Sequence, residues 1–577
     1  MRILPILKKH KWPILIAVLA AMIVAYPQAY FRYDQPDAYR GIEFIGASDD
    51  ESPWLSRARE AQDGYLTFSC VYLKDGKDAP YLFQPLGTVM FAQAGKFFAS
   101  DFNNSILTAR FFFSLLAFLA IYAFLYLFLK SRLIALAITS FFILAGTLFT
   151  RSGIFSLLRG QSPTHNFLDL TRPVNPSLTF LFFFAFLSLF WLFIEKKQWK
   201  YGILSALALG LSFYDYFFTW TFIFAFCGAL GLIFLIQKRF QDIKRIMLVI
   251  GLSLIMAIPY FINMYQTVNY PMYFEVGQRM GLLASRAPVL GLVVPLLFVA
   301  VLLFFPRKPR DRYLFALALV IAPFIVLNQQ LITGKVLGYA HYHWYYHKPL
   351  AIILLLAILF FWLAKIKRPL FNKALPVLMI AGSLAMGIFI QQSSYEFNKA
   401  EIIDKQKYGP VMDWLNENAE KDAVVFSNNK TAHMVVIFTP LNVFYHSSSR
   451  YCLVSTKERL LNNLFLYYRL DGVAAEEAQE LFLKDKRQIS AIIFSMFYRE
   501  TTGDYSGVPD DIIIGFSEKY KETLTMPAEE FLNNLWTKYE VEYLIWNKSE
   551  NPKWNLDQYK FLKRVAEFGD FVVYEKE

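Results

Sequence analysis

The chain has 577 residues, of which 56% are hydrophobic, 18% aromatic and only 18% charged, and its mean hydropathy is +0.35. Because an average soluble protein has about 25% charged residues, a soluble globular fold that would have to bury this much apolar surface is excluded. The net charge of +12 does not indicate nucleic-acid binding, because the basic residues stand in short clusters between apolar runs, as the positive-inside rule expects for a membrane protein.

Most of the apolar residues fall in runs of about twenty, which is the length that a helix needs to cross a hydrocarbon core of about 30 Å. Backbone polar groups find no water there, so each run must be helical. The sequence predicts about eleven membrane-spanning helices, at about residues 13–30, 104–129, 133–150, 177–194, 200–215, 218–236, 245–264, 288–305, 313–328, 350–364 and 373–391.

The basic clusters predict the topology. Lys8, Lys9 and Lys11 precede the first run, which ends without a small-residue cleavage site and is therefore expected to be an uncleaved helix with a cytoplasmic N-terminus. Every later cluster falls on the same side, and an odd number of spans places the end of the chain outside. We expect a multi-pass protein of the plasma or bacterial inner membrane, with a membrane domain (1–391), an extracytoplasmic loop one (31–103) and an extracytoplasmic domain (392–577).

The segment 392–577 has short β-prone runs between amphipathic helical stretches, which predicts an α/β domain. The predicted strands are Ala423–Phe426, Met434–Phe438, Ile489–Phe494, Tyr543–Trp546 and Phe571–Tyr574, and the predicted helices are Tyr408–Asn418, Thr456–Tyr468 and Ala528–Tyr539. The chain has three cysteines. Cys227 lies in an apolar run and is expected in the core. Cys70 and Cys452 would both lie outside the cytoplasm, which allows a disulfide, although nothing in the sequence brings them together.

Three adjacent acids, Asp49, Asp50 and Glu51, stand in loop one directly before a predicted helix. Ser48 suits the N-cap of that helix and Pro53 its first turn. In one interpretation the acids only cap the positive end of the helix dipole on a solvated loop. In the other, one acid is a general base, and its acidic neighbour raises its pKa or shares a cation with it.

Other unusual polar residues also lie in the expected extracytoplasmic loops. Arg172 and Asn175 belong to a two-proline segment, which is either a rigid turn before the next helix or a place where a guanidinium binds phosphate. Asp215 stands between two spans without a linker. It is a candidate functional acid at membrane depth or a residue of the rim in contact with water.

The loop 328–349 contains Lys335, His341, His343, His347 and Lys348 among five aromatic residues. One interpretation is a platform on which aromatic rings hold a sugar and cations hold a phosphate. The spacing of His343 and His347 also allows a metal site, although no acid or cysteine lies nearby to complete the ligand set. The third interpretation is an ordinary aromatic belt at the membrane interface.

Asp50-Glu51, the aromatic Trp54 and the later pair Arg59-Glu60 form a motif on loop one. With the layout of the spans and the C-terminal domain, this motif resembles the GT-C superfamily of integral membrane glycosyltransferases. The most similar branch contains the protein O-mannosyltransferases and the aminoarabinose transferases that modify lipid A. Members of the family carry an acidic motif in the first extracytoplasmic loop, about a dozen spans and, in this branch, a periplasmic α/β domain.

The resemblance implies a hexosyl or pentosyl transferase that moves a sugar from a polyprenyl-phosphate donor to a protein, glycan or lipid acceptor, with inversion. It implies Asp50 as the catalytic base, with Asp49 and Glu51 as alternatives. The leaving phosphate needs cations. No cofactor is expected by default, although the three acids would allow Mg²⁺ or Mn²⁺. The candidate substrate- and phosphate-binding residues are Arg57, Arg59, Arg172, Asn175, Asp215, Lys335, His341 and His343.

Functions of other classes remain alternatives. A transporter or flippase would usually show inverted repeats and buried charges near the bilayer centre, and the sequence has one such charge, Asp215, and no repeat. An oligosaccharide ligase or polymerase would also hold a lipid-linked sugar. A receptor built around the C-terminal domain would give no reason for acids and cations on the membrane loops.

Overall fold

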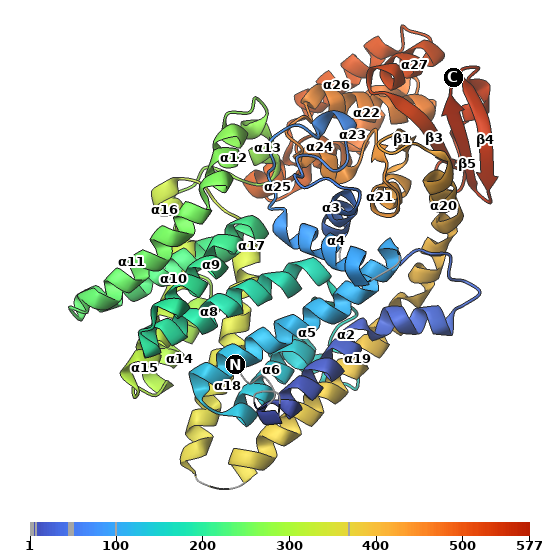
Figure 1. The fold of residues 1–577 in the computed structure, drawn as a ribbon. Helices are drawn as coiled ribbons and strands as arrows, with labels where there is room; N and C mark the ends of the chain where they lie inside the picture. Colours follow the sequence, from blue (N-terminus) through green and yellow to red (C-terminus); the bar gives the residue numbers. More distant parts are fainter. Residues whose placement is uncertain (1–4, 6–7, 44–50, 99–100, 367, 369) are drawn as a thin grey trace.

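The computed structural model describes residues 5, 8–43, 51–98, 101–366, 368 and 370–577. The fold is a bundle of apolar helices with a smaller domain at one end, in which the last third of the chain packs over loop one (Figure 1). This is the expected class of fold, a helical membrane domain followed by an α/β domain.

Eight helical segments of the described chain are long and apolar enough to cross a membrane, or nine if a bent pair counts as one span. The protein is therefore a multi-pass membrane protein. Two further predicted runs form helices of 17 and 12 residues, α9 and α14, so each of the eleven predicted runs is helical. The helices are α2 (Lys11–Asp34), α5 (Phe102–Leu129), α6 (Arg132–Ala145), α8 (Thr179–Lys196), α9 (Trp199–Asp215), α10 (Phe217–Ile236), α11 (Phe240–Met256), α12 (Ile258–Val268), α14 (Val293–Phe304), α15 (Arg310–Leu327), α18 (Lys348–Lys365) and α19 (Leu375–Lys405).

The run predicted as one helix at 245–264 is the bent pair α11 and α12, which meet at 60°. Pro259 stands in the first turn of α12. A proline is tolerated there because a backbone N–H at this position would have no acceptor within the helix. The bend carries α12 toward loop one. There the Asn263 amide and the backbone of Tyr81 exchange two hydrogen bonds, of 2.8 and 3.1 Å.

Helix α19 continues beyond its predicted end near residue 391 to Lys405, over 31 residues. Gln391 explains the continuation, because its buried side chain accepts from the Leu168 backbone N–H (3.0 Å) and donates to the Val24 carbonyl (2.9 Å). A polar residue at the end of the apolar run is thus satisfied inside the bundle. The expected boundary between 391 and 392 falls within this continuous helix.

The described part of loop one contains the helices α3 (Ser52–Gln62) and α4 (Leu86–Phe98) and the short turn η1 (Lys74–Gly76). Smaller helical segments stand between the spans. They are α7 (Arg151–Leu158), η3 (Asp169–Thr171), η4 (Pro173–Leu178), α13 (Tyr273–Arg279), α16 (Gln330–Thr333), α17 (Tyr339–Tyr342) and η5 (His343–His347).

The C-terminal domain has a five-stranded mixed sheet in the order β2-β1-β3-β5-β4, in which β1 pairs parallel with β2 and β3 and the remaining pairs are antiparallel. The strands are β1 (Val424–Ser427), β2 (Asn442–Val443), β3 (Val541–Asn547), β4 (Leu562–Phe568) and β5 (Phe571–Lys576). The helices are α20 (Gly409–Asn418), α21 (Asn429–Phe438), α22 (Lys457–Leu470), α23 (Ala475–Lys484), α24 (Lys486–Ile493), α25 (Met496–Thr502), α26 (Asp510–Thr523) and α27 (Ala528–Lys538).

Two of the predicted strands are wrong, because Met434–Phe438 lies in α21 and Ile489–Phe494 overlaps α24. Helix α21 begins at an Asn428 cap whose side chain accepts from the Thr431 backbone N–H at 2.9 Å, and its apolar run is buried on all sides. A fully buried helix has no polar face, so its sequence pattern cannot be distinguished from that of a buried strand. In α24 only one face is buried, at Ile489 and Ile493, which have helical spacing.

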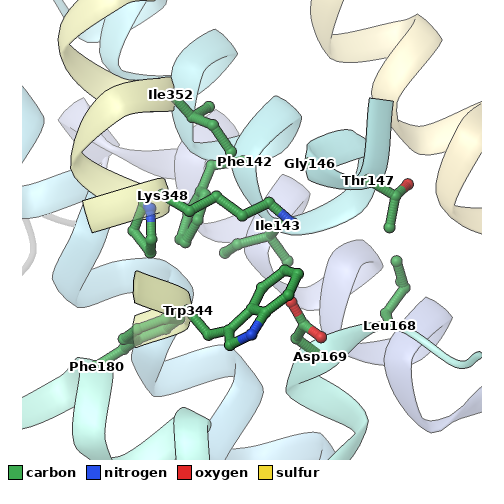
Figure 2. Close-up of a pocket in the computed structure, with 11 residues that line it drawn as sticks. Phe142, Ile143, Gly146, Thr147, Leu168, Asp169, Phe180, Trp344, Lys348 and Ile352 are labelled. Atoms are coloured by element: carbon green, nitrogen blue, oxygen red, sulfur yellow. The ribbon is translucent and has the colours of Figure 1, made fainter. Parts of the chain in front are cut away.

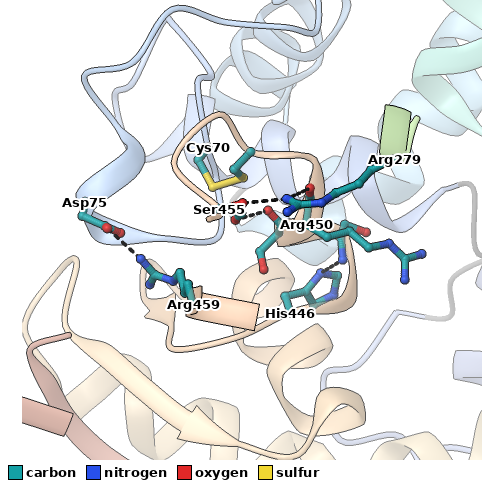
Figure 3. The surroundings of a disulfide bond; sticks show 10 residues. Cys70, Asp75, Arg279, His446, Arg450, Ser455 and Arg459 are labelled. Carbon is teal, nitrogen blue, oxygen red and sulfur yellow. Dashed lines mark hydrogen bonds and ion pairs between the residues drawn. A yellow bond between two sulfur atoms is a disulfide. The ribbon is translucent and has the colours of Figure 1, made fainter. Parts of the chain in front are cut away.

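A disulfide between Cys70 and Cys452 joins loop one to the C-terminal domain. Beside it, Arg459 of the C-terminal domain forms an ion pair with Asp75 of loop one at 2.6 Å (Figure 3). The two cysteines are 382 residues apart in the sequence, which is why the sequence alone could not pair them.

Two further contacts tie the C-terminal domain to the membrane domain at the same place. The Val443 backbone N–H donates to the Tyr72 carbonyl at 2.8 Å, so loop one lies along the edge strand β2. From the membrane domain, the buried Arg279 of α13 donates to the Ser455 carbonyl at 2.6 Å (Figure 3). The C-terminal domain is therefore fixed to two separate parts of the membrane domain.

Replacing Cys70 and Cys452 by Ser should lower the stability of the C-terminal domain by about 2–4 kcal/mol, because the cross-link restrains the unfolded chain. Denaturation of the detergent-solubilised protein, followed by proteolysis of the C-terminal domain, measures the effect. A reductant should lower the stability of the C-terminal domain in wild type but not in the double variant. The Cys227→Ser variant, which lacks the buried free thiol, should lose as much stability in reductant as wild type does. If reductant leaves the stability of wild type unchanged, the prediction is contradicted.

Candidate functional site

Glu51 is buried at the start of α3 and forms an ion pair with Arg110 of α5 at 2.7 Å, and the side chains of both are at most 1% exposed. The Arg110 Nε also donates to the Thr171 carbonyl at 2.9 Å. The other two acids of the motif, Asp49 and Asp50, lie outside the described residues. Glu51 makes no side-chain cap of the helix. Its carboxylate neutralises a buried guanidinium, which suits a structural acid better than a base.

Tyr216 lies at the break between α9 and α10, where residues from four segments meet. Its hydroxyl is 2.5 Å from the His341 Nδ1 of α17, and its ring lies 6.2 Å from the ring of Trp54 of α3. The side chains of Asn175 and Arg172 approach the same hydroxyl. We call Trp54, Arg172, Asn175, Tyr216 and His341 the Tyr216 cluster. It brings together three of the residues predicted from the sequence to bind substrate.

Asp215 and Asn175 are 2% and 4% exposed, and each has one side-chain oxygen without a hydrogen-bond partner among the described residues. The other oxygen of Asp215 faces Thr179 and the backbone of α4, where a Cβ on Gly87 would come within 3.1 Å of it. Buried acceptors are nearly always satisfied in proteins. Two such acceptors beside Tyr216 therefore favour a place where a hydroxyl donor from water or a ligand is held.

Arg57 and Arg59 of α3 have different surroundings. The Arg57 guanidinium is 6% exposed and lies over the rings of Phe83 (4.0 Å) and Trp54 (5.1 Å), and none of the described carboxylates pairs with it. Burial lowers the pKa of Arg57 to about 10, which leaves it cationic at neutral pH. Arg59 is occupied by an ion pair with Asp63 (3.0 Å) and a hydrogen bond to the Phe438 carbonyl of α21 (3.2 Å).

A cavity of about 720 Å³ lies between α13, the segments 281–285 and 333–336, and α25 of the C-terminal domain. Lys335, Gln278 and Glu500 line it with aromatic residues that include Tyr273 and Tyr339. The Lys335 ammonium lies 6.0 Å from the centre of the Tyr273 ring. Its volume is in the range of small-molecule sites.

A second cavity of about 30 Å³ is lined by Asp169, Trp344 and Lys348 among others (Figure 2). It has room for a single water molecule. His343 packs against Trp344 with its ring centre at 5.1 Å, and His347 is buried. Within the described part of the chain, no three His, Cys, Asp or Glu side chains form a group that could hold a metal ion. A cation at the acids of loop one falls mostly outside that part.

A polar network joins α3 to the C-terminal domain around Lys77. Its ammonium pairs with Glu60 at 3.0 Å and with Asp422 of the C-terminal domain, which also accepts from the Tyr65 hydroxyl at 2.5 Å. Burial raises the pKa of Glu60 to about 7, although Lys77 opposes the shift. The Arg59-Glu60 pair of the sequence motif thus attaches α3 to the C-terminal domain.

Sequence reasoning missed Arg110, Tyr216 and His433. Arg110 carried a usable signal, because a single charge early in an apolar run is expected to have a buried partner. Tyr216 directly follows Asp215, but a tyrosine among aromatic residues gives no signal of its own. His433 of α21, whose Nδ1 lies 3.1 Å from the Ser52 Oγ of α3, directly precedes the run Met434–Phe438 that was predicted to be a strand.

No protein-family model matches the chain, and no curated protein matches its sequence significantly. Among solved structures, the fold is similar to two crystal structures of ArnT from Cupriavidus metallidurans, one bound to undecaprenyl phosphate and one in the apo state. The TM-scores are 0.46 and 0.45 and the sequence identities 10% and 11%, with 98% of each chain covered. A likeness of this degree assigns no reaction to the chain.

Replacing Glu51 by Gln should lower the free energy of unfolding by about 3–5 kcal/mol, because the buried Arg110 guanidinium would lose the carboxylate that Glu51 supplies. Replacing Arg110 by Met should cost a similar amount. The double variant Glu51→Leu with Arg110→Met should recover most of the loss. Unfolding in detergent measures all three, and additive losses in the double variant would contradict a direct ion pair.

Glu60 should make stability depend on pH. Its pKa is about 7 in the folded protein and 4.5 in an unfolded chain, so the folded state holds the proton more tightly between these values. Stability from this group is complete below pH 4.5 and is lost as the pH rises through 7. The melting temperature of wild type relative to Glu60→Gln should therefore fall from pH 5 to pH 8. A constant difference over that range would show that Glu60 does not titrate there.

Proposed function

We propose that the protein is a membrane glycosyltransferase of the GT-C type. It takes a sugar from a polyprenyl-phosphate donor and transfers it to a hydroxyl acceptor on the side of the membrane where the C-terminal domain lies. The observation that carries the proposal is the cavity of about 720 Å³ between the ends of the apolar helices and that domain.

The surroundings of the cavity suit an amphipathic ligand. Lys335, Gln278 and Thr501 offer polar groups inside it, and Phe274, which also lines it, is 71% exposed. Ile332, the residue before the lining Thr333, is 86% exposed. Exposed apolar residues beside a polar cavity mark a place where a lipid can lie with its head inside and its tail along the apolar helices.

Helix α17 connects the cavity to the Tyr216 cluster. Tyr339 lines the cavity, and His341, two residues further along, is bonded to Tyr216. Arg57 also lies over the Trp54 ring, as a buried cation without a described carboxylate partner. A buried charge without a counterion is costly, and a phosphate would supply one. We assign Lys335 and Arg57 to the donor phosphate.

The chemistry follows from a base and these cations. The Asp50 carboxylate takes the proton of the acceptor hydroxyl, and the oxygen attacks the anomeric carbon from the face opposite the phosphate. The bond from that carbon to the phosphate oxygen breaks, and the phosphate leaves as an anion that Arg57 and Lys335 stabilise. Glu51 is less suited to this role than Asp50 or Asp49, because its carboxylate is already paired with Arg110.

The disulfide supports an extracytoplasmic C-terminal domain, because disulfides persist in oxidising compartments. With the basic clusters on the opposite side, it favours a plasma or inner membrane protein that works on its outer face. The sugar and the acceptor are left open by this proposal, and a protein, a glycan or a lipid would each present the required hydroxyl.

The test is mass spectrometry of the lipids that co-purify with wild type, Asp50→Asn and Arg57→Gln. The Asp50→Asn variant should retain a polyprenyl-phosphate sugar, because it binds the donor but cannot activate the acceptor. Wild type should hold the spent polyprenyl phosphate or an empty site. The Arg57→Gln variant should retain about ten-fold less carrier lipid, the effect of losing about one charged hydrogen bond.

The matched control is Arg487→Gln, which removes an Arg that is 73% exposed on the C-terminal domain and should leave lipid retention unchanged. Bulk phospholipid alone in every sample, together with no sugar transfer in membranes, would contradict the proposed function. Normal sugar transfer by the Asp50→Asn variant would show that Asp50 is not the base, and Asp49 would then be the next candidate.

A further inference from the structure

The C-terminal domain reaches the start of α3 through two histidines. His433 of α21 places its Nδ1 3.1 Å from the Ser52 Oγ and 3.2 Å from the His446 Nε2. His446 is buried between β2 and η8 (Ser447–Tyr451), and its Nδ1 lies 3.0 Å from the Ser448 backbone nitrogen (Figure 3 shows its position beside the disulfide). Figure 1 shows α21 beside α3, where the two helices pack.

The hydrogen bonds fix the positions of the protons. The Ser448 backbone N–H can only donate, so the His446 Nδ1 carries no proton and its Nε2 carries one. Burial lowers the pKa of His446 well below its usual range, and His433 and Arg450 add to this. The neutral His446 therefore donates from Nε2 to the His433 Nδ1, which must be an acceptor.

The arrangement is held on all sides. The Tyr72 ring of loop one stacks on the His446 ring with centres 4.5 Å apart, and the two histidine rings stack at 5.5 Å. The Asn429 side chain at the start of α21 accepts from the Ser447 backbone N–H at 2.7 Å, so α21 and η8 cannot shift independently. A side chain held in this way can fix the position of what it touches.

The Ser52 hydroxyl and the His446 Nε2–H both face the Nδ1 of His433. The hydroxyl thus shares one acceptor with the His446 N–H, and this contact orients Ser52.

Ser52 is the first residue of α3 and directly follows Glu51 and the rest of the acidic run. The same turn is held from the opposite side, because the Glu51 carboxylate is paired with Arg110 and the Glu51 carbonyl accepts from the Trp54 and Leu55 backbone N–H groups. The start of α3 therefore lies between the membrane domain and the C-terminal domain.

We propose that His433 is a positioning residue through which the C-terminal domain orients the first turn of α3, which in the sequence directly follows the acidic run. The proposal rests on the proposed function for its catalytic meaning. It gives the C-terminal domain a part in the reaction although that domain offers no catalytic group of its own.

The test compares His433→Ala with His433→Asn and Ser52→Ala. The Asn side chain places an amide oxygen near the position of the imidazole Nδ1 and can accept the same hydrogen bonds. In His433→Ala, kcat should fall about five- to ten-fold, the effect of about one hydrogen bond, while KM for the lipid donor stays within about two-fold. His433→Asn should recover most of kcat. The Ser52→Ala and His433→Ala losses should not add, because they remove the same contact.

Hydrogen exchange provides a readout that does not depend on the reaction. The peptide 52–62, which carries the Trp54 and Leu55 amides, should exchange faster in His433→Ala than in wild type, while the C-terminal sheet is unchanged. The matched control is His165→Ala, which removes a histidine that stacks on Phe397 (4.0 Å) on α19 and does not touch α3.

The outcomes separate the two proposals. Faster exchange in a protein without any glycosyl transfer supports positioning and contradicts the proposed function. Unchanged exchange and unchanged kcat in His433→Ala overturn the positioning role. Equal losses of kcat in Ala and Asn, with equally lowered melting temperatures, also overturn it, because they would show that His433 only stabilises the C-terminal domain.

Discussion

The site depends on the buried ion pair between Glu51 and Arg110. Loop one connects α2 to α5 and carries the acidic motif, and this pair fixes one end of α3 to α5 in the buried interior. A charge pair in such a place has little freedom, because either partner alone would be strongly unfavourable. Ser52, Trp54 and Arg57 follow Glu51 on the same helix.

The C-terminal domain completes the site from the other side. It is attached to loop one by the disulfide and by the Lys77 network, and to the membrane domain by Arg279 of α13. These attachments join segments from the first and last thirds of the chain. The cavity lined by Lys335 and α25 exists only because the two domains are held together in this way.

The sequence predicted the membrane helices well because the bilayer allows little choice: a run of about twenty apolar residues has to be a helix. It failed where burial removes the polar face, as in α21, and where a proline divides a single apolar run, as at Pro259 between α11 and α12. For the candidate site, it singled out Trp54, Arg57, Asp215 and Lys335, whose types are unusual for their surroundings. It could not find Tyr216 or His433, whose roles come from partners far away in the chain.

Helix α19 couples the C-terminal domain to the bilayer as a rigid rod. Its 31 residues span about 46 Å at 1.5 Å per residue, and no flexible linker separates the part among the other spans from the part that enters the C-terminal domain. A rod of that length tilted by about 5° displaces its far end by about 4 Å. Helix tilt follows membrane thickness. A change in the lipid composition of the membrane would therefore move the C-terminal domain, including α25 at the cavity.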